Sequence, residues 1–234
     1  MNLTIYKNAL RNGLMNPFSL IINCAIPLIL TIFGSNVGFG AMDVGRQFFL
    51  IAMLVMWGAF VMSKSVQSDK QDGVLIRILA GPVTMRGYLV QNFFAALTPM
   101  VILSLAIGML GLILHSWDFI FTLGLVLCYI FLAATSVGLS FVWSCFFKDK
   151  EASTAGVSIL LTATAAIGGF FLPLAILPTP IFYVGALFPA HWASRAIEQL
   201  LIYGTMTNMY WLGVLAMGLF TTAFILFGGK RRLV

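Results

Sequence analysis

The chain has 234 residues, of which 61% are hydrophobic and only 9% are charged. Soluble domains carry about 25% charged residues, so this composition excludes a soluble fold. The formal net charge of +6 does not indicate nucleic-acid binding, because the Lys and Arg residues are scattered at the ends of apolar runs and form no single patch. We therefore predict a membrane protein with no nucleic-acid partner, whose basic residues set its orientation in the bilayer.

The first 16 residues precede the first long apolar run and have the pattern of an amphipathic helix. Leu3, Tyr6, Leu10 and Leu14 share one helical face, and the adjoining side is polar and basic. Such a helix lies in the plane of the membrane with its apolar face buried. We predict an interfacial helix over residues 1–16.

Six apolar stretches follow that are long enough to cross a bilayer as helices. About 20 apolar residues are needed, because every backbone polar group must be satisfied within the segment. The first stretch carries no charge from Pro17 to Met42, which is too long for a signal-peptide core of about 7–15 residues. We predict an all-α integral membrane protein, a single domain over residues 1–234, with spans at about 17–36, 47–63, 87–114, 119–147, 152–177 and 210–229.

The basic residues predict how these spans are oriented. With six spans both ends of the chain lie on one side, and that side receives every Lys and Arg except Arg46 and Arg195. The positive-inside rule then places both termini in the cytosol. Two connections are long: a cytosolic loop at 64–86 and an external segment at 178–208.

The external segment at 178–208 is too apolar for a free loop, and it contains several prolines. Its part from Ala190 to Tyr203 has the pattern of a helix that ends at Gly204. We predict short helices that re-enter the outer leaflet without crossing it, before the last span. Such backbone is tolerated only where protein or water covers its ends.

Groups that carry chemistry are missing from the predicted spans. None of the spans contains Asp, Glu, Lys, Arg or His, so no residue is placed to relay protons or bind a coupling ion. Cys24, Cys128 and Cys145 have neither C-x-x-C spacing nor a neighbouring His, and we predict neither disulfides nor a metal site. Signatures of a nucleotide-binding loop or a hydrolase are also absent, so we expect no enzyme activity in this chain.

Polar residues form weak stripes within the spans. Ser136, Ser140 and Ser144 lie one helical turn apart, a pattern typical of close helix packing. An alternative interpretation is that polar and aromatic residues of the first and fifth spans line a substrate path. The candidates for this path are Asn23, Thr31, Ser158, Thr162, Phe170 and Phe171.

The loop at 64–86 holds most of the mixed charge of the chain. Within it, Val74, Leu75, Ile78 and Leu79 fall on one face of a short helix. A short amphipathic helix tethered to the membrane at both ends is suited to docking a cytosolic partner.

The order of these elements resembles that of the type-2 permeases of ATP-binding-cassette exporters. In that family the loop between the second and third spans reads approximately acidic-basic-acidic-x-Gly-Thr-Leu-x-x-Leu-Leu-x-x-Pro-Val-Ser and docks on the ATPase as a coupling helix. A Pro-x-x-Trp before the last span is similar to Pro189 and Trp192. Here Gln71 and Val74 depart from the family's pattern. The matching loop residues are Asp69, Lys70, Gly73, Leu75, Ile78, Leu79, Pro82, Val83 and Thr84.

The resemblance implies a multi-pass permease of a bacterial or archaeal plasma (inner) membrane. It also implies two copies of a cytosolic ATPase that bind ATP and Mg, and a second permease subunit, identical or homologous. No cofactor is expected on this chain itself. The residues expected to couple it to the ATPase are Asp69, Lys70, Asp72, Gly73, Leu75, Arg77, Leu79 and Pro82.

The uncharged spans favour export of an amphiphile, such as an antimicrobial peptide, a hydrophobic drug or a lipid. Export of a polysaccharide is the alternative within the same family. A secondary carrier or channel that works without ATP is a second class of function, disfavoured by the absence of intramembrane charge and of inverted repeats.

Overall fold

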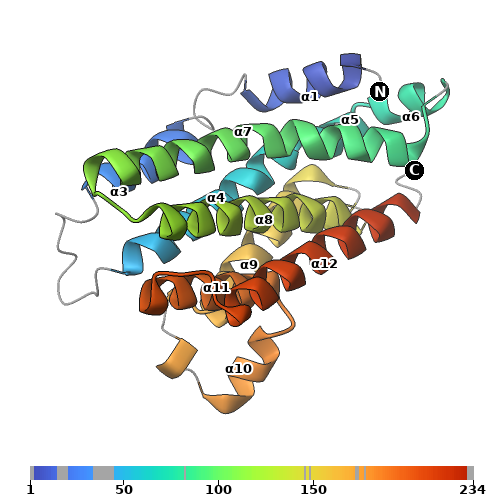
Figure 1. Ribbon diagram of the computed structural model, residues 1–234. Helices are drawn as coiled ribbons and strands as arrows, with labels where there is room; N and C mark the ends of the chain where they lie inside the picture. Colours follow the sequence, from blue (N-terminus) through green and yellow to red (C-terminus); the bar gives the residue numbers. More distant parts are fainter. Residues whose placement is uncertain are drawn as a thin grey trace.

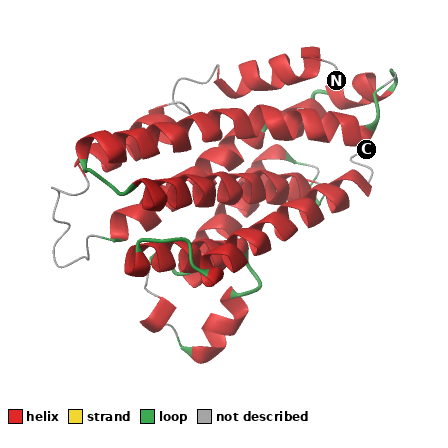
Figure 2. Cartoon of the chain, viewed as in Figure 1, coloured by secondary structure: helices red, strands yellow, loops and turns green. Residues whose placement is uncertain are grey.

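The computed structural model of the protein describes residues 3–14, 21–33, 45–81, 83–144, 146–147, 149–171, 174–176 and 178–230. Every regular element within these ranges is a helix (Figure 2). The predicted all-α class is therefore confirmed for the part of the chain that the structure describes.

The helices follow the chain in the order in which Figure 1 labels them. They are α1 (Leu3–Leu14), the π-helix η1 (Ile21–Ala25), α3 (Ile26–Phe33), α4 (Arg46–Ser63), α5 (Ser65–Gln71), α6 (Val74–Leu79), α7 (Met85–Leu114), α8 (Phe119–Ser144), α9 (Lys150–Ile167), the 3-10 helix η2 (Leu174–Ile176), α10 (Thr179–Gly185), α11 (Pro189–Tyr203) and α12 (Asn208–Lys230).

Four helices within the described residues are long and apolar enough to cross a membrane. They overlap the predicted second, third, fourth and sixth spans, and two shorter apolar helices overlap the predicted first and fifth. The membrane-spanning character is thus confirmed, whereas the count of six spans stays a prediction. The long helices cover Arg46–Gln71, Met85–Leu114, Phe119–Ser144 and Asn208–Gly228, and the shorter ones Asn23–Phe33 and Glu151–Ile167.

The predicted span at 152–177 does not form one continuous helix. α9 ends at Ile167, and the chain then passes through Gly168 and Gly169. Gly169 has a φ of 96°, a conformation that right-handed helical backbone cannot contain. Within the predicted fourth span, α8 ends at Ser144, three residues before the predicted bound.

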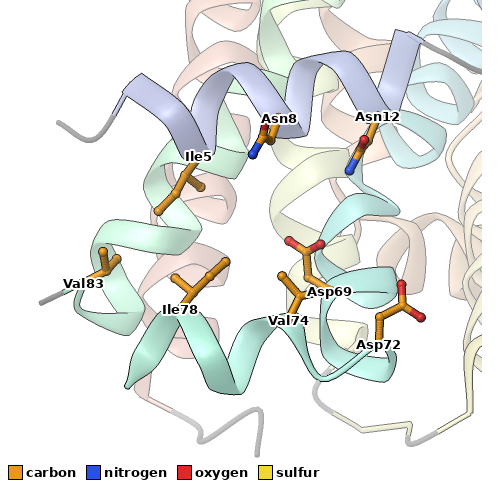
Figure 3. A pocket seen from close by; sticks show the side chains of 8 residues that line it. All are labelled: Ile5, Asn8, Asn12, Asp69, Asp72, Val74, Ile78 and Val83. Carbon is orange, nitrogen blue, oxygen red and sulfur yellow. The ribbon is translucent and has the colours of Figure 1, made fainter. Parts of the chain in front are cut away.

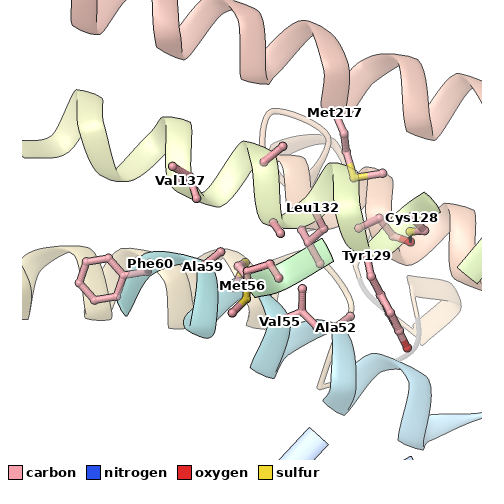
Figure 4. Packing of buried hydrophobic residues seen from close by; sticks show 14 of the residues in the cluster. Ala52, Val55, Met56, Ala59, Phe60, Cys128, Tyr129, Leu132, Val137 and Met217 are labelled. Carbon is pink, nitrogen blue, oxygen red and sulfur yellow. Dashed lines mark hydrogen bonds between the residues drawn. The ribbon is translucent and has the colours of Figure 1, made fainter. Parts of the chain in front are cut away.

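α8 lies at the centre of the helix bundle, with α4, α7, α11 and α12 packed around it (Figure 1). Figure 4 shows Ala52 and Met56 of α4 facing Leu132 of α8, and Met217 of α12 on the other side of α8. All four are buried. Small residues such as Ala52 let helix backbones approach closely. Within lipid there is no hydrophobic driving force between helices, so close packing of this kind holds them together.

Side-chain hydrogen bonds to backbone carbonyls also join α8 to α4. Ser136 Oγ donates to the Met56 carbonyl at 2.7 Å, and Tyr129 Oη donates to the Phe48 carbonyl at 3.0 Å. Such bonds contribute on the order of 0.6 kcal/mol each within a membrane. The other two serines of the predicted stripe are buried as well, so this stripe serves helix packing.

The bundle has one end that carries most of the polar elements. It contains α5 and α6, together with the start of α1 and the end of α12 (Figure 1). We call it the basic end. α11 lies toward the opposite end (Figure 1), and its re-entry into the outer leaflet stays a prediction. Gly204 ends α11 with a φ of 66°, which confirms the predicted stop.

Candidate docking site at the basic end of the bundle

α5 and α6 form a helix–turn–helix that continues α4 beyond the apolar part of the bundle. α4 ends at Ser63 and α5 starts at Ser65, with only Lys64 between them. Gly73 then adopts a φ of 67° and a ψ of 6° before α6 begins. This left-handed conformation costs other residues about 1–2 kcal/mol, so the glycine of the predicted motif permits the turn. Thr84 caps α7, because its Oγ1 accepts from the Gly87 backbone nitrogen at 3.2 Å.

α6 turns one apolar face inward and presents a second surface outward. Leu75 is only 1% exposed, and Ile78 and Leu79 are half-buried, which confirms the predicted apolar stripe. Ile76 is 55% exposed, and Arg77 beside it is exposed too. Leu75 and Leu79 therefore anchor α6 to the bundle, and the outward surface is built from residues between them.

Ile76 is a surface residue that the sequence prediction missed. The sequence contained a sign of it. Ile76 lies on the side of the short helix opposite the apolar stripe, where no contact within the chain requires an apolar side chain. Such a residue is a suitable anchor for a partner protein.

Asp69 points toward α7. Its Oδ2 accepts a hydrogen bond of 2.6 Å from the hydroxyl of Tyr88, a fully buried residue near the start of α7. Bonds to an ionised carboxylate are among the stronger hydrogen bonds in proteins. Asp69 therefore attaches α5 to α7, a role that its position in the loop motif alone did not indicate.

Lys70 binds the end of α8. Its Nζ donates to the carbonyl oxygens of Ser144 at 3.2 Å and Phe147 at 3.1 Å. The last carbonyls of a helix carry partial negative charge, and a cation placed on them contributes about 0.3–1 kcal/mol. The ammonium group of Lys70 thus faces the bundle and holds α5 against α8.

Two neutral side chains complete the attachment of α5. Ser65 Oγ donates to Asn92 Oδ1 of α7 at 3.2 Å. Gln67 Nε2 donates to the carbonyl of Asp149 at 3.4 Å, and Asp149 caps the start of α9 by accepting from the Ala152 backbone nitrogen at 2.9 Å. α5 is therefore bonded to α7, to the end of α8 and to the start of α9.

The predicted coupling residues consequently divide into two groups. Asp72 and Arg77 are exposed and available to a partner. Pro82 lies outside the described residues. The remaining five fix the geometry of the site from within: Asp69, Lys70, Gly73, Leu75 and Leu79.

Asn23 and Thr31, predicted to line a substrate path, are both buried. A Cβ at Gly58 of α4 would lie 3.3 Å from the Asn23 Cβ, so η1 and α4 approach closely at this point. Thr31 Oγ1 donates to the Pro27 carbonyl of its own helix at 2.8 Å. In this conformation both side chains fill helix contacts.

The candidates in and after α9 are spread over different surfaces. Thr162 is exposed, and its hydroxyl donates to the Ser158 carbonyl at 2.9 Å. Phe170 is buried against Phe49 of α4, with ring centroids 6.5 Å apart. Phe171 is partly exposed. The six predicted path residues therefore lie on different surfaces of the described chain, and the substrate path stays a prediction.

Polar side chains in α11 are buried at the opposite end of the bundle. His191 and Ser194 are both fully buried, and neither ring nitrogen of His191 nor the Ser194 hydroxyl has a hydrogen-bond partner. Burial lowers the pKa of His191, so this imidazole is neutral at pH 7. No group of His, Cys, Asp and Glu residues in the described ranges is arranged to hold a metal ion.

Comparison with known families identifies one match, which covers nearly the whole chain. Residues 4–230 match the model of the family described as ABC-2 family transporter protein. No curated protein matches the chain.

Proposed function

Because the chain belongs to the ABC-2 family of transporter proteins, we propose that it is the permease subunit of an exporter driven by a separate cytosolic ATPase. The family and the four long apolar helices make it a multi-pass membrane protein. On this proposal the basic end faces the cytosol, in agreement with the distribution of Lys and Arg. The membrane is the plasma membrane of a bacterium or an archaeon.

The observation that carries the proposal is the way α5 joins an exposed helix to the bundle. α6 presents Ile76 and Arg77 outward, and α5 connects α6 directly to α4. The bonds of Asp69, Lys70 and Gln67 connect α5 to α7, α8 and α9. A displacement of α6 by an ATPase would therefore reach four helices through short, directional contacts.

The partner would supply the nucleotide chemistry. We propose two ATPase copies, each binding ATP and Mg, and a second permease subunit that completes the transport path. The outer side of α9 supports a subunit contact, since Ile159 is 71% exposed and Thr162 is exposed beside it. An exposed helix face with both apolar and hydroxyl groups suits packing against another helix.

We propose an amphiphilic substrate, namely an antimicrobial peptide, a hydrophobic drug or a lipid. Support comes from the uncharged spans, whose path candidates offer hydroxyl, amide and aromatic groups. A polysaccharide is the alternative. Transport by the purified chain in liposomes without ATP would instead favour a secondary carrier or channel.

The ATPase docking is tested with Ile76→Asp. If Ile76 anchors the partner, the charged variant should reduce co-purification of the ATPase from cell membranes by about thirtyfold, the effect of losing an interface hot spot of about 2 kcal/mol. Leu187→Asp is the matched control, because Leu187 is 70% exposed between α10 and α11, away from α6 in the chain, and it should leave co-purification unchanged. Full retention of the ATPase by Ile76→Asp would remove α6 from the proposed interface.

A further inference from the structure

α10 is a short helix that projects from the bundle beside α9 (Figure 1). Most of its side chains are exposed, and that of Tyr183 is 68% exposed. Only two of its residues are turned inward: Phe182 is half-buried and Gly185 is buried. α10 is therefore held to the rest of the chain mainly at Phe182 and Gly185.

Both of these residues lie against His191 of α11. The ring centroids of Phe182 and His191 are 4.8 Å apart, with an interplanar angle of 80°. A Cβ added at Gly185 would lie 3.1 Å from Nδ1 of His191 and 3.0 Å from the carbonyl oxygen of Ile167, so the glycine permits this close approach. α10 thus helps to cover the imidazole of His191, which is fully buried.

The surroundings of His191 suit a neutral imidazole and not a charged one. A protonated imidazole carries two N–H donors, and neither ring nitrogen has a hydrogen-bond partner in the described chain. The guanidinium of Arg195 lies over the same Phe182 ring, 5.4 Å from its centroid, and would repel a second positive charge. A buried charge without a partner is costly, so protonation of His191 favours a state in which α10 moves aside and water reaches the ring.

Arg195 is the charged neighbour that acts on His191. Burial lowers the pKa of His191 most, and the charge of Arg195 lowers it further. α9 carries its charged residues in its first turn, near α5. The other titratable side chains on this half of the helices around α11 are Arg46 of α4, Cys128 and Tyr129 of α8, Tyr183 of α10, Glu198 and Tyr203 of α11, and Tyr210 of α12. The carboxylate of Glu198 accepts from the Leu174 backbone nitrogen at 3.4 Å and does not bond the imidazole.

We infer that α10 is a pH-sensitive latch, which is docked while His191 is neutral and released when His191 takes up a proton. The latch goes beyond the proposed function and does not depend on it, because its contacts are all within this chain. On the proposed orientation, α10 lies at the external end of the bundle and responds to the pH outside the cell.

The direction of the pH effect follows from the lowered pKa of His191. With α10 released, the imidazole is in water and has the ordinary pKa of about 6.5. With α10 docked, the pKa is lower, so the released state binds more protons once the pH falls below about 6.5. Docking is therefore strongest above that pH. Below it, docking weakens by up to about tenfold for each pH unit, until the docked imidazole is protonated as well.

The test is amide hydrogen exchange of α10 in the full-length chain, held in lipid nanodiscs. Rates are measured from about pH 7.5 to about pH 4.5, on both sides of the ordinary imidazole pKa, and each is compared with the intrinsic rate of an unfolded peptide at that pH. A helix this short is not stable alone in water, so release of α10 exposes its amides. We expect the protection of wild-type α10 to fall by up to about tenfold per pH unit below about 6.5.

His191→Gln cannot titrate in this range, and α10 should keep one level of protection across it. His115→Gln is the matched control, because His115 is the second of the two histidines in the chain and lies between α7 and α8. This variant should keep the pH response of α10. A response that persists in His191→Gln, or one that disappears in His115→Gln, would overturn the latch.

NMR of ¹³C-labelled histidine in the wild type tests the same equilibrium without a change at His191. The two signals are assigned with His115→Gln. We expect His191 to titrate below about pH 6.5, because docking of α10 favours its neutral form. Titration of His191 at or above that pH would mean that docking does not oppose its protonation, and the latch would be wrong. Neither measurement uses the ATPase or transport, so the outcome is separate from that of the proposed function.

Discussion

At the scale of single residues, Gly73 shows how backbone conformation shapes the proposed docking site. A Cβ added at Gly73 would meet no atom within 4 Å, so space does not explain the glycine. Its φ of 67° does, because only Gly, and to a lesser degree Asn and Asp, adopts this region readily.

The left-handed conformation at Gly73 predicts different outcomes for two substitutions of similar size. Gly73→Val should destabilise the α5–α6 turn by at least about 1–2 kcal/mol, and Gly73→Asn should retain most of the wild-type stability and transport. Both are measured as thermal midpoints in detergent and as export activity in cells. Equal damage by the two variants would mean that the side chain, and not the φ angle, is limiting.

At the scale of elements, α5 connects the exposed helix α6 to the rest of the bundle. Lys70 is the side chain that joins it to α8, through the carbonyls of Ser144 and Phe147. The resemblance to type-2 permeases counts this lysine among the residues that couple the chain to the ATPase. In the structure, Lys70 caps the C-terminal end of α8. The stabilisation that this contact contributes depends on the distance between two residues that are 74 positions apart in the chain.

Lys70→Met tests this cap, since it keeps an unbranched stem and removes the ammonium. We expect faster amide hydrogen exchange in the last turn of α8 and weaker coupling of ATP hydrolysis to export, with normal membrane insertion. Lys70→Arg should restore both, because it can still donate to the carbonyls. The control is Lys7→Met on α1, where the lysine is exposed. Unchanged exchange in Lys70→Met would contradict the capping role.

At the scale of the whole molecule, the arrangement of the helices predicts a topology that labelling can test. Ser116 lies between α7 and α8, and Thr205 between α11 and α12, both at the end of the bundle opposite Arg77. All three residues are exposed. If the basic end is cytosolic, the two faces of the membrane separate them.

The experiment uses single cysteines in a chain whose three native cysteines are changed to alanine. Ser116→Cys and Thr205→Cys should react with a membrane-impermeant maleimide added to intact cells, and Arg77→Cys should react only after permeabilisation. Reaction of Arg77→Cys and Ser116→Cys from the same side would be incompatible with the proposed orientation.

Much of the architecture follows from the sequence by itself, because hydropathy and helical periodicity are local properties. Composition and the apolar runs predict a helical membrane protein. The apolar stripe of α6 and the stop of α11 at Gly204 also follow from neighbouring residues, and both are present in the structure. The loop motif pointed to the transporter family that the match over residues 4–230 then showed.

Only the tertiary structure decided which side chains of the loop face outward and which face the bundle. Asp69 and Lys70 are engaged by Tyr88 and by the end of α8, and Ile76 is left exposed. The pocket between α1 and the α5–α6 turn (Figure 3) likewise depends on how α1 lies over α5 and α6. These orientations depend on contacts between elements that are distant in the chain. A lysine side chain turns toward the nearest carbonyl oxygens, and an aspartate side chain turns toward the nearest hydrogen-bond donor. The pattern of adjacent residues does not specify which group that will be.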